Sequence, residues 1–285
     1  MNTVSIQAPA KVNLYLHVTG RRADGYHLLD SLFAFAKDGD VVSVRNAETL
    51  SLKVKGPYAG ALPDTKENIV LKAARALAET CAVTTGAEII LEKNLPVASG
   101  IGGGSADAAA VLKALCQLWN TDISEQKLSE IALRLGADVP SCLCSEAVQV
   151  SGIGDVLTPA PAFPRLFVVL VNPNKPVSTP AVFKTRDPVF SQASPLTEKI
   201  ADFDDFILAL SRRRNDLYEA ACRLEPDIGQ VIWELNDSPF CRLARMSGSG
   251  GTCFGLFPDA QKAFSACEKM RSKHPNWWFL NTMIV

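Results

Sequence analysis

The sequence predicts a two-lobed α+β protein, and three observations support this prediction. Segments with strand and helix patterns are intermixed along the 285 residues without a regular β-α-β rhythm. A proline-rich stretch at 158–164, with the sequence TPAPAFP, separates two parts of comparable length. Hydrophobic residues make up 47% of the chain, which is enough for a substantial core. We therefore expect an N-terminal lobe of residues 1–157 and a C-terminal lobe of residues 158–285.

The N-terminal lobe is expected to begin with strands. Residues 4–18 read as a strand in which polar and apolar residues alternate from Lys11 onward. Asp24-Gly25 marks a turn, and residues 41–54 contain two further strand-like pieces. Lys11 and Asn13 share the polar face of the first strand. That face either points to solvent or forms the floor of a cleft where Lys11 meets phosphate oxygens.

Helices are expected in the rest of this lobe. Asn68 is placed to cap a helix that starts after it. Residues 87–92 read as a short strand, and an apolar stripe over residues 108–119 predicts a second helix. Ser124 suits the cap of a third helix, which Gly136 ends.

The most informative stretch is the sequence LPVASGIGGGSADAAA at residues 95–110, with four glycines in five positions. It lies between the strand at 87–92 and the second helix. Glycines let backbone N–H groups approach a ligand, and a helix N-terminus adds unpaired donors with partial positive charge. This order predicts an anion site, most commonly for phosphate. The loop lacks both the P-loop lysine and the dinucleotide-binding spacing, and a plain flexible connection is the alternative.

Three other features are candidates for chemistry. Asp138, in the sequence LGADVP, either caps a short helix or accepts a proton from a substrate hydroxyl. Residues 247–252, SGSGGT, form either a tight turn before a strand at 253–257 or a second contact for a phosphorylated ligand. Tyr26 and His27 either stack on a base or pack in the core.

Composition excludes several classes of protein. A net charge of −1 without a long basic run argues against nucleic-acid binding. The start of the chain has no signal-peptide pattern. Residues 165–171 read as a buried strand, and the apolar run at 166–171 within them is too short to span a bilayer. The eight cysteines form no C-x-x-C pair, and with three histidines a structural zinc site is not expected. Free thiols in the cytoplasm are the simplest interpretation.

The loop PVASGIGGGSADAA resembles the P-x-x-x-G-[LI]-G-x-[SG]-S-[AS] loop of the galactokinase, homoserine kinase, mevalonate kinase and phosphomevalonate kinase superfamily. Four other stretches, in the same order, resemble one family within it, the 4-diphosphocytidyl-2-C-methyl-D-erythritol kinases. They are APAKVNLYLHVTGRRADGYH, LGADVP, VSTPAVF and MSGSGGTCFGLF. Because these stretches spread over nearly the whole chain, the combination is specific.

The resemblance implies a two-lobed small-molecule kinase fold with a catalytic cleft between an ATP-binding and a substrate-binding lobe. It implies an ATP-dependent kinase of non-mevalonate isoprenoid biosynthesis. The reaction would move the γ-phosphate of ATP to the 2-hydroxyl of the cytidine-diphosphate-linked methylerythritol. Mg²⁺ is expected with ATP, resting on phosphates and water because no dedicated ligand residues are visible. Nothing in the sequence indicates an oligomeric state.

The resemblance also implies residue roles. Asp138 would be the catalytic base and Lys11 its charged partner. The residues implied to hold ATP are Pro96, Val97, Ala98, Ser99, Gly100, Ile101, Gly102, Gly103, Gly104, Ser105, Ala106, Asn68 and Ile69. The residues implied to bind the acceptor are Asn13, Tyr26, His27, Thr179, Phe183, Gly248, Ser249 and Gly250.

Ala98 and Ser99 depart from the family pattern, because many relatives have glycine there. Either residue suits the loop if its φ is negative. A homoserine-type or mevalonate-type kinase and a nucleotide-binding protein without catalysis are the alternative functions. The residues Tyr26, His27 and Phe183 favour the cytidine-linked acceptor over the first alternative, since homoserine and mevalonate carry no base to stack. The joint presence of Lys11 and Asp138 argues against the second.

Overall fold

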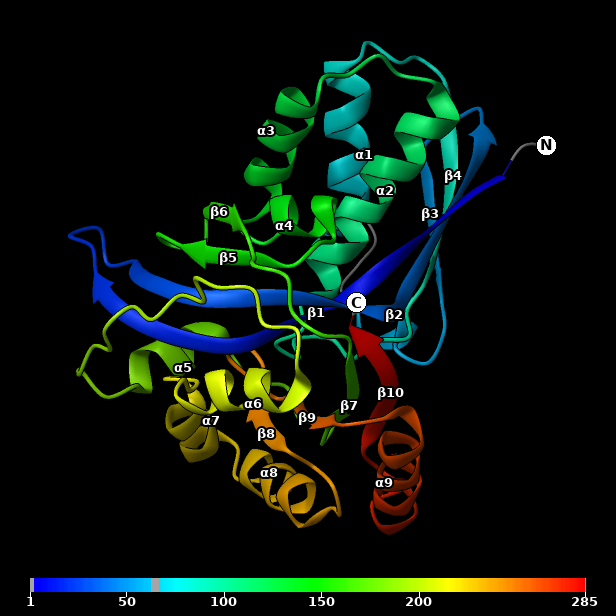
Figure 1. Cartoon of the computed structure of the whole chain (residues 1–285). Coiled ribbons are helices and arrows are strands. Elements are labelled where there is room, and N and C mark those ends of the chain that lie inside the picture. The colour runs from blue at the N-terminus through cyan, green and yellow to red at the C-terminus, as the bar shows by residue number, and fades with distance from the viewer. Residues whose placement is uncertain (1–2, 63–66, 285) are drawn as a thin grey trace. The chain divides into compact units, whose positions relative to one another are not determined.

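A computed structural model describes residues 3–62 and 67–284 and confirms the α+β class (Figure 1). The elements in chain order are β1 (Thr3–Arg21), β2 (His27–Ala47), β3 (Ser51–Lys55), η1 (Ala59–Ala61), α1 (Ile69–Thr80), β4 (Gly86–Glu92), α2 (Gly103–Trp119), α3 (Glu125–Leu135), α4 (Val139–Cys144), β5 (Val148–Ser151), β6 (Val156–Pro159), β7 (Leu166–Asn172), α5 (Thr179–Thr185), α6 (Phe203–Ser211), α7 (Tyr218–Leu224), α8 (Asp227–Asp237), β8 (Leu243–Met246), β9 (Cys253–Phe257), α9 (Ala260–Lys273) and β10 (Trp278–Ile284).

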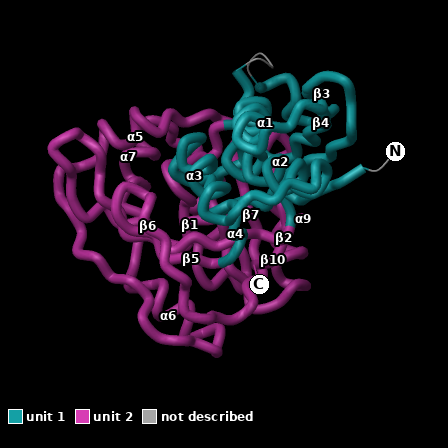
Figure 2. The backbone as a smooth tube through the Cα atoms, turned by 90° about the horizontal axis from the view of Figure 1, so that it is seen from above, with its two compact units in different colours: residues 1–11, 38–97, 102–146 teal, residues 12–37, 98–101, 147–285 magenta. Residues whose placement is uncertain are grey.

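The chain forms two compact units, and each is discontinuous in sequence (Figure 2). Unit 1 contains residues 1–11, 38–97 and 102–146, and unit 2 contains residues 12–37, 98–101 and 147–285. This division differs from the single boundary expected between residues 157 and 158. The reason is that β1, β2 and the glycine loop each begin in one unit and continue in the other.

The stretch at 158–164 is only in part a linker. Thr158 and Pro159 belong to β6, which pairs antiparallel with β5. Proline is tolerated there because Pro159 is the last residue of a strand that pairs with β5 alone. The prediction that this stretch separates two lobes therefore does not hold for its first two residues.

Unit 1 contains the second half of β2, paired antiparallel with β4, while β3 runs parallel to β4. Helices α1, α2 and α3 lie together over this part of the chain (Figure 1). Two caps expected from the sequence are present: Asn68 Oδ1 accepts from the N–H of Val70 at 2.9 Å, and Ser124 Oγ accepts from that of Lys127 at 3.3 Å. These caps fix where α1 and α3 begin.

Unit 2 contains an antiparallel sheet in the order β10-β7-β9-β8, and the first half of β2 pairs with β5. The expected strands at 165–171 and 253–257 correspond to β7 and β9. Both strands are buried along almost their whole length, because helices α8 and α9 pack on this sheet. The buried sheet holds in place the loop at 247–252, which joins β8 to β9.

The polar face of β1 is buried. Lys11, Asn13, Tyr15 and His17 are each 5% exposed or less, so of the two alternatives the solvent-facing strand is wrong. Tyr15 shows how the face is satisfied: its hydroxyl donates to Asp30 Oδ1 at 2.9 Å. Burial raises the pKa of Tyr15, and the nearby Asp30 carboxylate raises it further. Its proton is therefore held in place for this bond.

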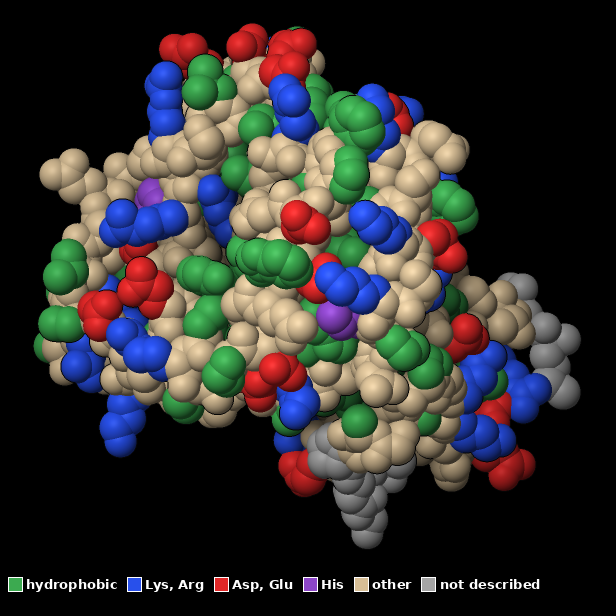
Figure 3. Space-filling view, turned by 90° about the horizontal axis from the view of Figure 1, so that it is seen from below, with side chains coloured by type: hydrophobic (Ala, Val, Ile, Leu, Met, Phe, Trp, Pro, Cys, Tyr) green, Lys and Arg blue, Asp and Glu red, His purple; other side chains and the backbone are tan. Residues whose placement is uncertain are grey.

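The surface charges and the lengths of the described helices agree with the near-zero net charge and the short apolar runs of the sequence. On the face drawn in Figure 3, acidic and basic side chains are interspersed among the coloured residues. No helix in the described part of the chain is long and apolar enough to cross a membrane.

Candidate active site

The site begins with an ion pair inside unit 1. Lys11 Nζ on β1 donates to Asp138 Oδ2 at 2.9 Å, across 127 positions in sequence. The Lys11 side chain is 5% exposed, whereas that of Asp138 is 34% exposed. The buried ammonium therefore holds a carboxylate that a substrate can reach.

Asp138 stands at the N-cap position of α4, but its side chain makes no capping bond. The capping role weighed for it is therefore wrong. The backbone turns helical at Asp138 itself, with φ −84° and ψ −14°, whereas a capping residue has extended geometry. The carboxylate is left to pair with Lys11 instead.

The start of α2 lies against the same lysine. Gly102, the residue before α2, has φ +64°, and a Cβ there would lie 3.2 Å from both Cβ and Cε of Lys11. Glycine is required at this position by both the left-handed backbone and the close approach. Lys11 thus lies beside the unpaired N–H groups of a 17-residue helix, where anions are favoured.

The residues predicted to bind ATP differ in how far they are exposed to solvent. Ile69 lies next to the loop, since a Cβ on Gly104 would be 3.9 Å from its Cγ2. Ser99, Ile101 and Ala106 are 5% exposed or less, so their side chains are buried. The other predicted members of the loop that are buried or partly buried are Pro96, Val97, Gly100, Gly102, Gly103 and Ser105, while Ala98 and Gly104 are exposed.

Residues 98–101, the tip of the glycine loop, belong to unit 2 and pack on the second glycine motif. Ser247 Oγ donates to the carbonyl of Gly100 at 3.0 Å, and the N–H of Thr252 donates to that of Ser99 at 3.0 Å. Ser247 Oγ also accepts from the N–H of Asn13 at 3.0 Å. One buried hydroxyl therefore joins the loop tip to β1.

Ala98 has φ +51°, so the condition under which alanine would suit this position, a negative φ, is not met. The left-handed region is costly for a residue with a Cβ. The bonds that hold Ser99 and Gly100 against residues 247–252 impose this geometry, which glycine adopts without cost.

Four of the predicted acceptor residues line one cavity of about 880 Å³ in unit 2: Tyr26, His27, Thr179 and Phe183. The ring of His27 stacks on that of Phe183, with centroids 5.0 Å apart. Tyr26 is 62% exposed, so the alternative of a core tyrosine is wrong. Burial, with further contributions from Arg186 and Arg21, lowers the pKa of His27 and favours its neutral form.

The remaining acceptor candidates, Asn13, Gly248, Ser249 and Gly250, do not line this cavity. Ser249 Oγ lies 2.7 Å from Thr179 Oγ1, which connects the second glycine motif to α5. Asn13 Nδ2 donates to Ser31 Oγ at 3.0 Å. Gly248 and Gly250 are buried, and a Cβ on Gly248 would lie 2.8 Å from the carbonyl oxygen of Gly100. Gly248 therefore serves the close packing of two loops, whereas a Cβ on Gly250 would lie 2.8 Å from Sδ of Met246.

Several polar residues of the site were not predicted from the sequence. Ser247 lies within the glycine motif that drew attention, so that motif was a usable signal. Arg21, Lys184 and Arg186 make the cavity strongly cationic, with Asp24 as its acidic lining residue in the described chain. Nothing in the local pattern distinguishes these three from surface residues.

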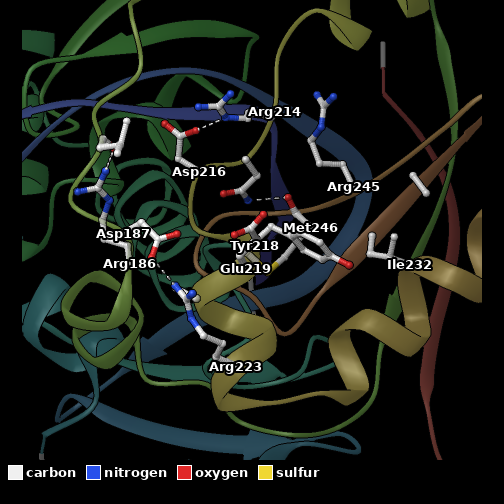
Figure 4. Close-up of a pocket in the computed structure, with 14 residues that line it drawn as sticks. Arg186, Asp187, Arg214, Asp216, Tyr218, Glu219, Arg223, Ile232, Arg245 and Met246 are labelled. Carbon is white, nitrogen blue, oxygen red and sulfur yellow. Dashed lines mark hydrogen bonds and ion pairs between the residues drawn. The ribbon is translucent and has the colours of Figure 1, made fainter.

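A second cavity of about 420 Å³ in unit 2 contains none of the predicted site residues (Figure 4). Arg214 pairs with Asp216 and Arg223 pairs with Asp187 in its wall, and Arg186 lines both cavities. Within residues 3–62 and 67–284, no group of three or more His, Cys, Asp or Glu side chains is arranged to hold a metal ion.

Comparison with known proteins is consistent across sequence and structure. The sequence model for the GHMP kinases N terminal domain matches residues 68–146, and that for GHMP kinases C terminal matches residues 199–276. A 4-diphosphocytidyl-2-C-methyl-D-erythritol kinase of Paramagnetospirillum magneticum is 53% identical over 285 residues, which covers 100% of both chains. A kinase of the same name from Rhodospirillum rubrum is 52% identical and covers 95% of this chain and 89% of that protein.

Solved structures give the same result. The crystal structure of a 4-(cytidine 5'-diphospho)-2C-methyl-D-erythritol kinase has a TM-score of 0.82 and 34% identity and covers 99% of each chain. A homoserine kinase from Cytophaga hutchinsonii has a TM-score of 0.75 at 20% identity, over 100% of this chain and 95% of that one. The second likeness shows the fold alone.

We expect Ala98→Gly to stabilise the protein by about 0.5–1 kcal/mol, because it removes the left-handed strain at a small entropic cost. Ala76→Gly, inside α1, is the control and should cost about 1 kcal/mol. Urea unfolding of both variants measures the difference. An equal loss of stability in both would contradict a left-handed Ala98 in solution.

Proposed function

Because the chain belongs to the 4-diphosphocytidyl-2-C-methyl-D-erythritol kinases, a family of the GHMP kinases, we propose that it transfers the γ-phosphoryl group of ATP to the 2-hydroxyl of 4-diphosphocytidyl-2-C-methyl-D-erythritol. The products are ADP and the 2-phosphorylated acceptor. The reaction is a step of non-mevalonate isoprenoid biosynthesis.

One observation supports this function above the others: a single lysine contacts both the proposed base, Asp138, and the start of α2, where the phosphates are proposed to bind. Lys11 Nζ lies 2.9 Å from the accessible carboxylate of Asp138, and the Lys11 chain packs against Gly102 at the start of α2. A phosphate at the α2 N-terminus and a hydroxyl at Asp138 would therefore lie on either side of one ammonium group. Phosphoryl transfer depends on such positioning and charge neutralisation.

The proposed mechanism assigns each group one task. The backbone N–H groups at the start of α2 bind phosphate oxygens, and Lys11 offsets charge on the transferring group. Asp138 accepts the proton of the substrate's 2-hydroxyl while the oxygen of that hydroxyl forms a bond to the γ-phosphorus of ATP. The bond from that phosphorus to the bridging oxygen breaks, and ADP leaves. Asn13 and Thr179 orient the acceptor alcohol.

The cavity at Tyr26, His27 and Phe183 suits the cytidine diphosphate part of the acceptor. Its volume of about 880 Å³ is in the range of small-molecule pockets. Aromatic rings stack on bases, and a neutral His27 offers both a donor and an acceptor to a base edge. The cationic lining residues Arg21 and Arg186 are matched in charge to a diphosphate.

Mg²⁺ belongs to this proposal as the ion that accompanies ATP. We expect it on phosphate oxygens and water, because the described residues offer no dedicated ligand group. When bound, it would neutralise charge on the phosphates. A cytoplasmic location is also part of the proposal, and the eight cysteines, all described and all free thiols, are compatible with a reducing compartment.

The proposal is tested by measuring ADP release from purified protein with ATP and Mg²⁺. The acceptors are diphosphocytidyl-methylerythritol, homoserine, mevalonate and galactose, each alone. We expect ADP with the cytidine-linked alcohol only. ADP release with a different acceptor would mean that this acceptor is the substrate. Tight ATP binding without ADP release from any acceptor would indicate a binding protein.

We predict that Asp138→Asn lowers turnover by about 10²–10⁴-fold, because an amide cannot accept the proton. The affinity for ADP, measured by calorimetry, should stay unchanged. Asp122→Asn, at an exposed position, is the matched control and should keep full turnover. Near-normal turnover in the Asp138 variant would remove the base from the mechanism.

We predict that Tyr26→Ala raises the KM for the acceptor by about 5–150-fold, the range for losing one base-stacking contact. The KM for ATP should not change. Phe240→Ala, which removes a ring of similar exposure outside the cavity, is the control. Steady-state kinetics with each substrate varied separates the two constants. An unchanged acceptor KM would show that Tyr26 does not contact the base.

A further inference from the structure

Three charged side chains that the proposed mechanism does not use are buried together in unit 1. They are Asp40 on β2, Lys93 just after β4 and Asp107 on α2, with exposures of 0%, 2% and 2%. Lys93 Nζ donates to Asp40 Oδ2, and it donates to Asp107 Oδ2 at 2.8 Å. Burying these charges is costly, and their mutual pairing repays the cost only when the geometry is good.

The cluster contacts the chain where the glycine loop begins. Asp40 Oδ1 accepts from the N–H of Asn94 at 2.5 Å and from that of Leu95 at 2.8 Å. Leu95 immediately precedes Pro96, the first loop residue. One carboxylate therefore fixes two successive backbone groups at the loop entrance through charge-assisted bonds.

The same cluster contacts the chain where the loop ends. A Cβ on Gly103, the first residue of α2, would lie 3.0 Å from Lys93 Nζ and 3.7 Å from Asp40 Oδ2. Asp107 is one helical turn further along α2 and holds the same ammonium. The entrance and exit of the loop are thus attached to one buried ion cluster.

The cluster has one more carboxylate than it has cations. Asp107 Oδ1 is buried and has no hydrogen-bond partner among the described residues. Burial raises the pKa of Asp107, Lys93 opposes this effect, and the neighbouring Asp40 carboxylate adds to it. A fold that needed only a neutral pair would be served by Lys93 and Asp40, so the second carboxylate needs another explanation.

We propose that Asp107, held by Lys93, which also binds Asp40, is a positioning residue that sets the separation of the two ends of the glycine loop for ATP binding. This inference rests on the proposed function, because it takes the loop to be the ATP site. Asp107 touches no substrate in this proposal and acts through the backbone of α2. Its removal should therefore affect ATP binding and leave acceptor binding unchanged.

The first variant is Asp107→Ala. Lys93 stays paired with Asp40, so no buried charge loses its only partner and the fold is retained. We expect the KM and the calorimetric Kd for ATP to rise about 10-fold, since small displacements of binding groups are costly. The KM for the acceptor should stay within about twofold.

The second variant, Asp107→Asn, tests rescue by a side chain of the same shape. Its carbonyl oxygen accepts from Lys93 as the carboxylate does, through a weaker bond. We expect ATP affinity to recover to within about threefold of the wild type. The control is Glu88→Ala, which removes another buried carboxylate of unit 1, paired with Arg45 and Lys53 near the start of β4.

The outcomes separate this inference from the proposed function. If the wild type binds no ATP, the proposed function itself fails. If the wild type binds ATP and Asp107→Ala keeps that affinity, or loses ATP and acceptor affinity equally, the positioning role is overturned. It is also overturned if Glu88→Ala weakens ATP binding as much, because the effect then follows from general destabilisation. A selective, Asn-rescued loss of ATP affinity supports it.

Discussion

The buried ammonium of Lys11 is the constraint around which unit 1 is arranged. A lysine that is almost fully removed from water requires a partner, and Asp138 supplies it at 2.9 Å. Because the side chain of Asp138 is one-third exposed, solvent reaches the aspartate of this pair but hardly reaches the lysine. An ion pair of this kind keeps a carboxylate in place for proton transfer while leaving it accessible.

The lysine also determines the residue at the start of α2. Gly102 has a left-handed backbone and lies against the Lys11 chain, so a Cβ there would crowd the lysine. The helix can then begin close to the ammonium, and its positive end adds to the same field. For the phosphate that we propose to bind here, charge would thus be neutralised by a side chain and a helix that share one packing contact.

The glycine loop is held at its ends and at its tip by different means. In unit 1, the cluster of Asp40, Lys93 and Asp107 contacts its entrance and exit. In unit 2, the hydroxyl of Ser247 holds the carbonyl of Gly100, and this imposes strain on the neighbouring Ala98. A loop that must present backbone N–H groups to a ligand gains rigidity from such contacts, which reduces the ordering cost of binding.

Local sequence determined the elements themselves. The caps at Asn68 and Ser124 and the strands β7 and β9 follow from residues within a few positions of one another, and all are found where the pattern predicts them. The motif resemblance likewise identified the family, since each of its five stretches is a continuous run of residues that can be read without the fold. The two compact units differ from the single predicted boundary for the opposite reason, because long strands carry the chain from one unit into the other.

Only the tertiary structure decided the states of individual side chains. Whether the polar face of β1 meets solvent, and whether Asp138 caps α4 or pairs with Lys11, depends on segments 127 positions apart. The cluster of Asp40, Lys93 and Asp107 joins three elements, and no local pattern separates its members from surface charges. Periodicity reports which side of an element a residue occupies, whereas burial and charge pairing depend on what the folded chain brings against that side.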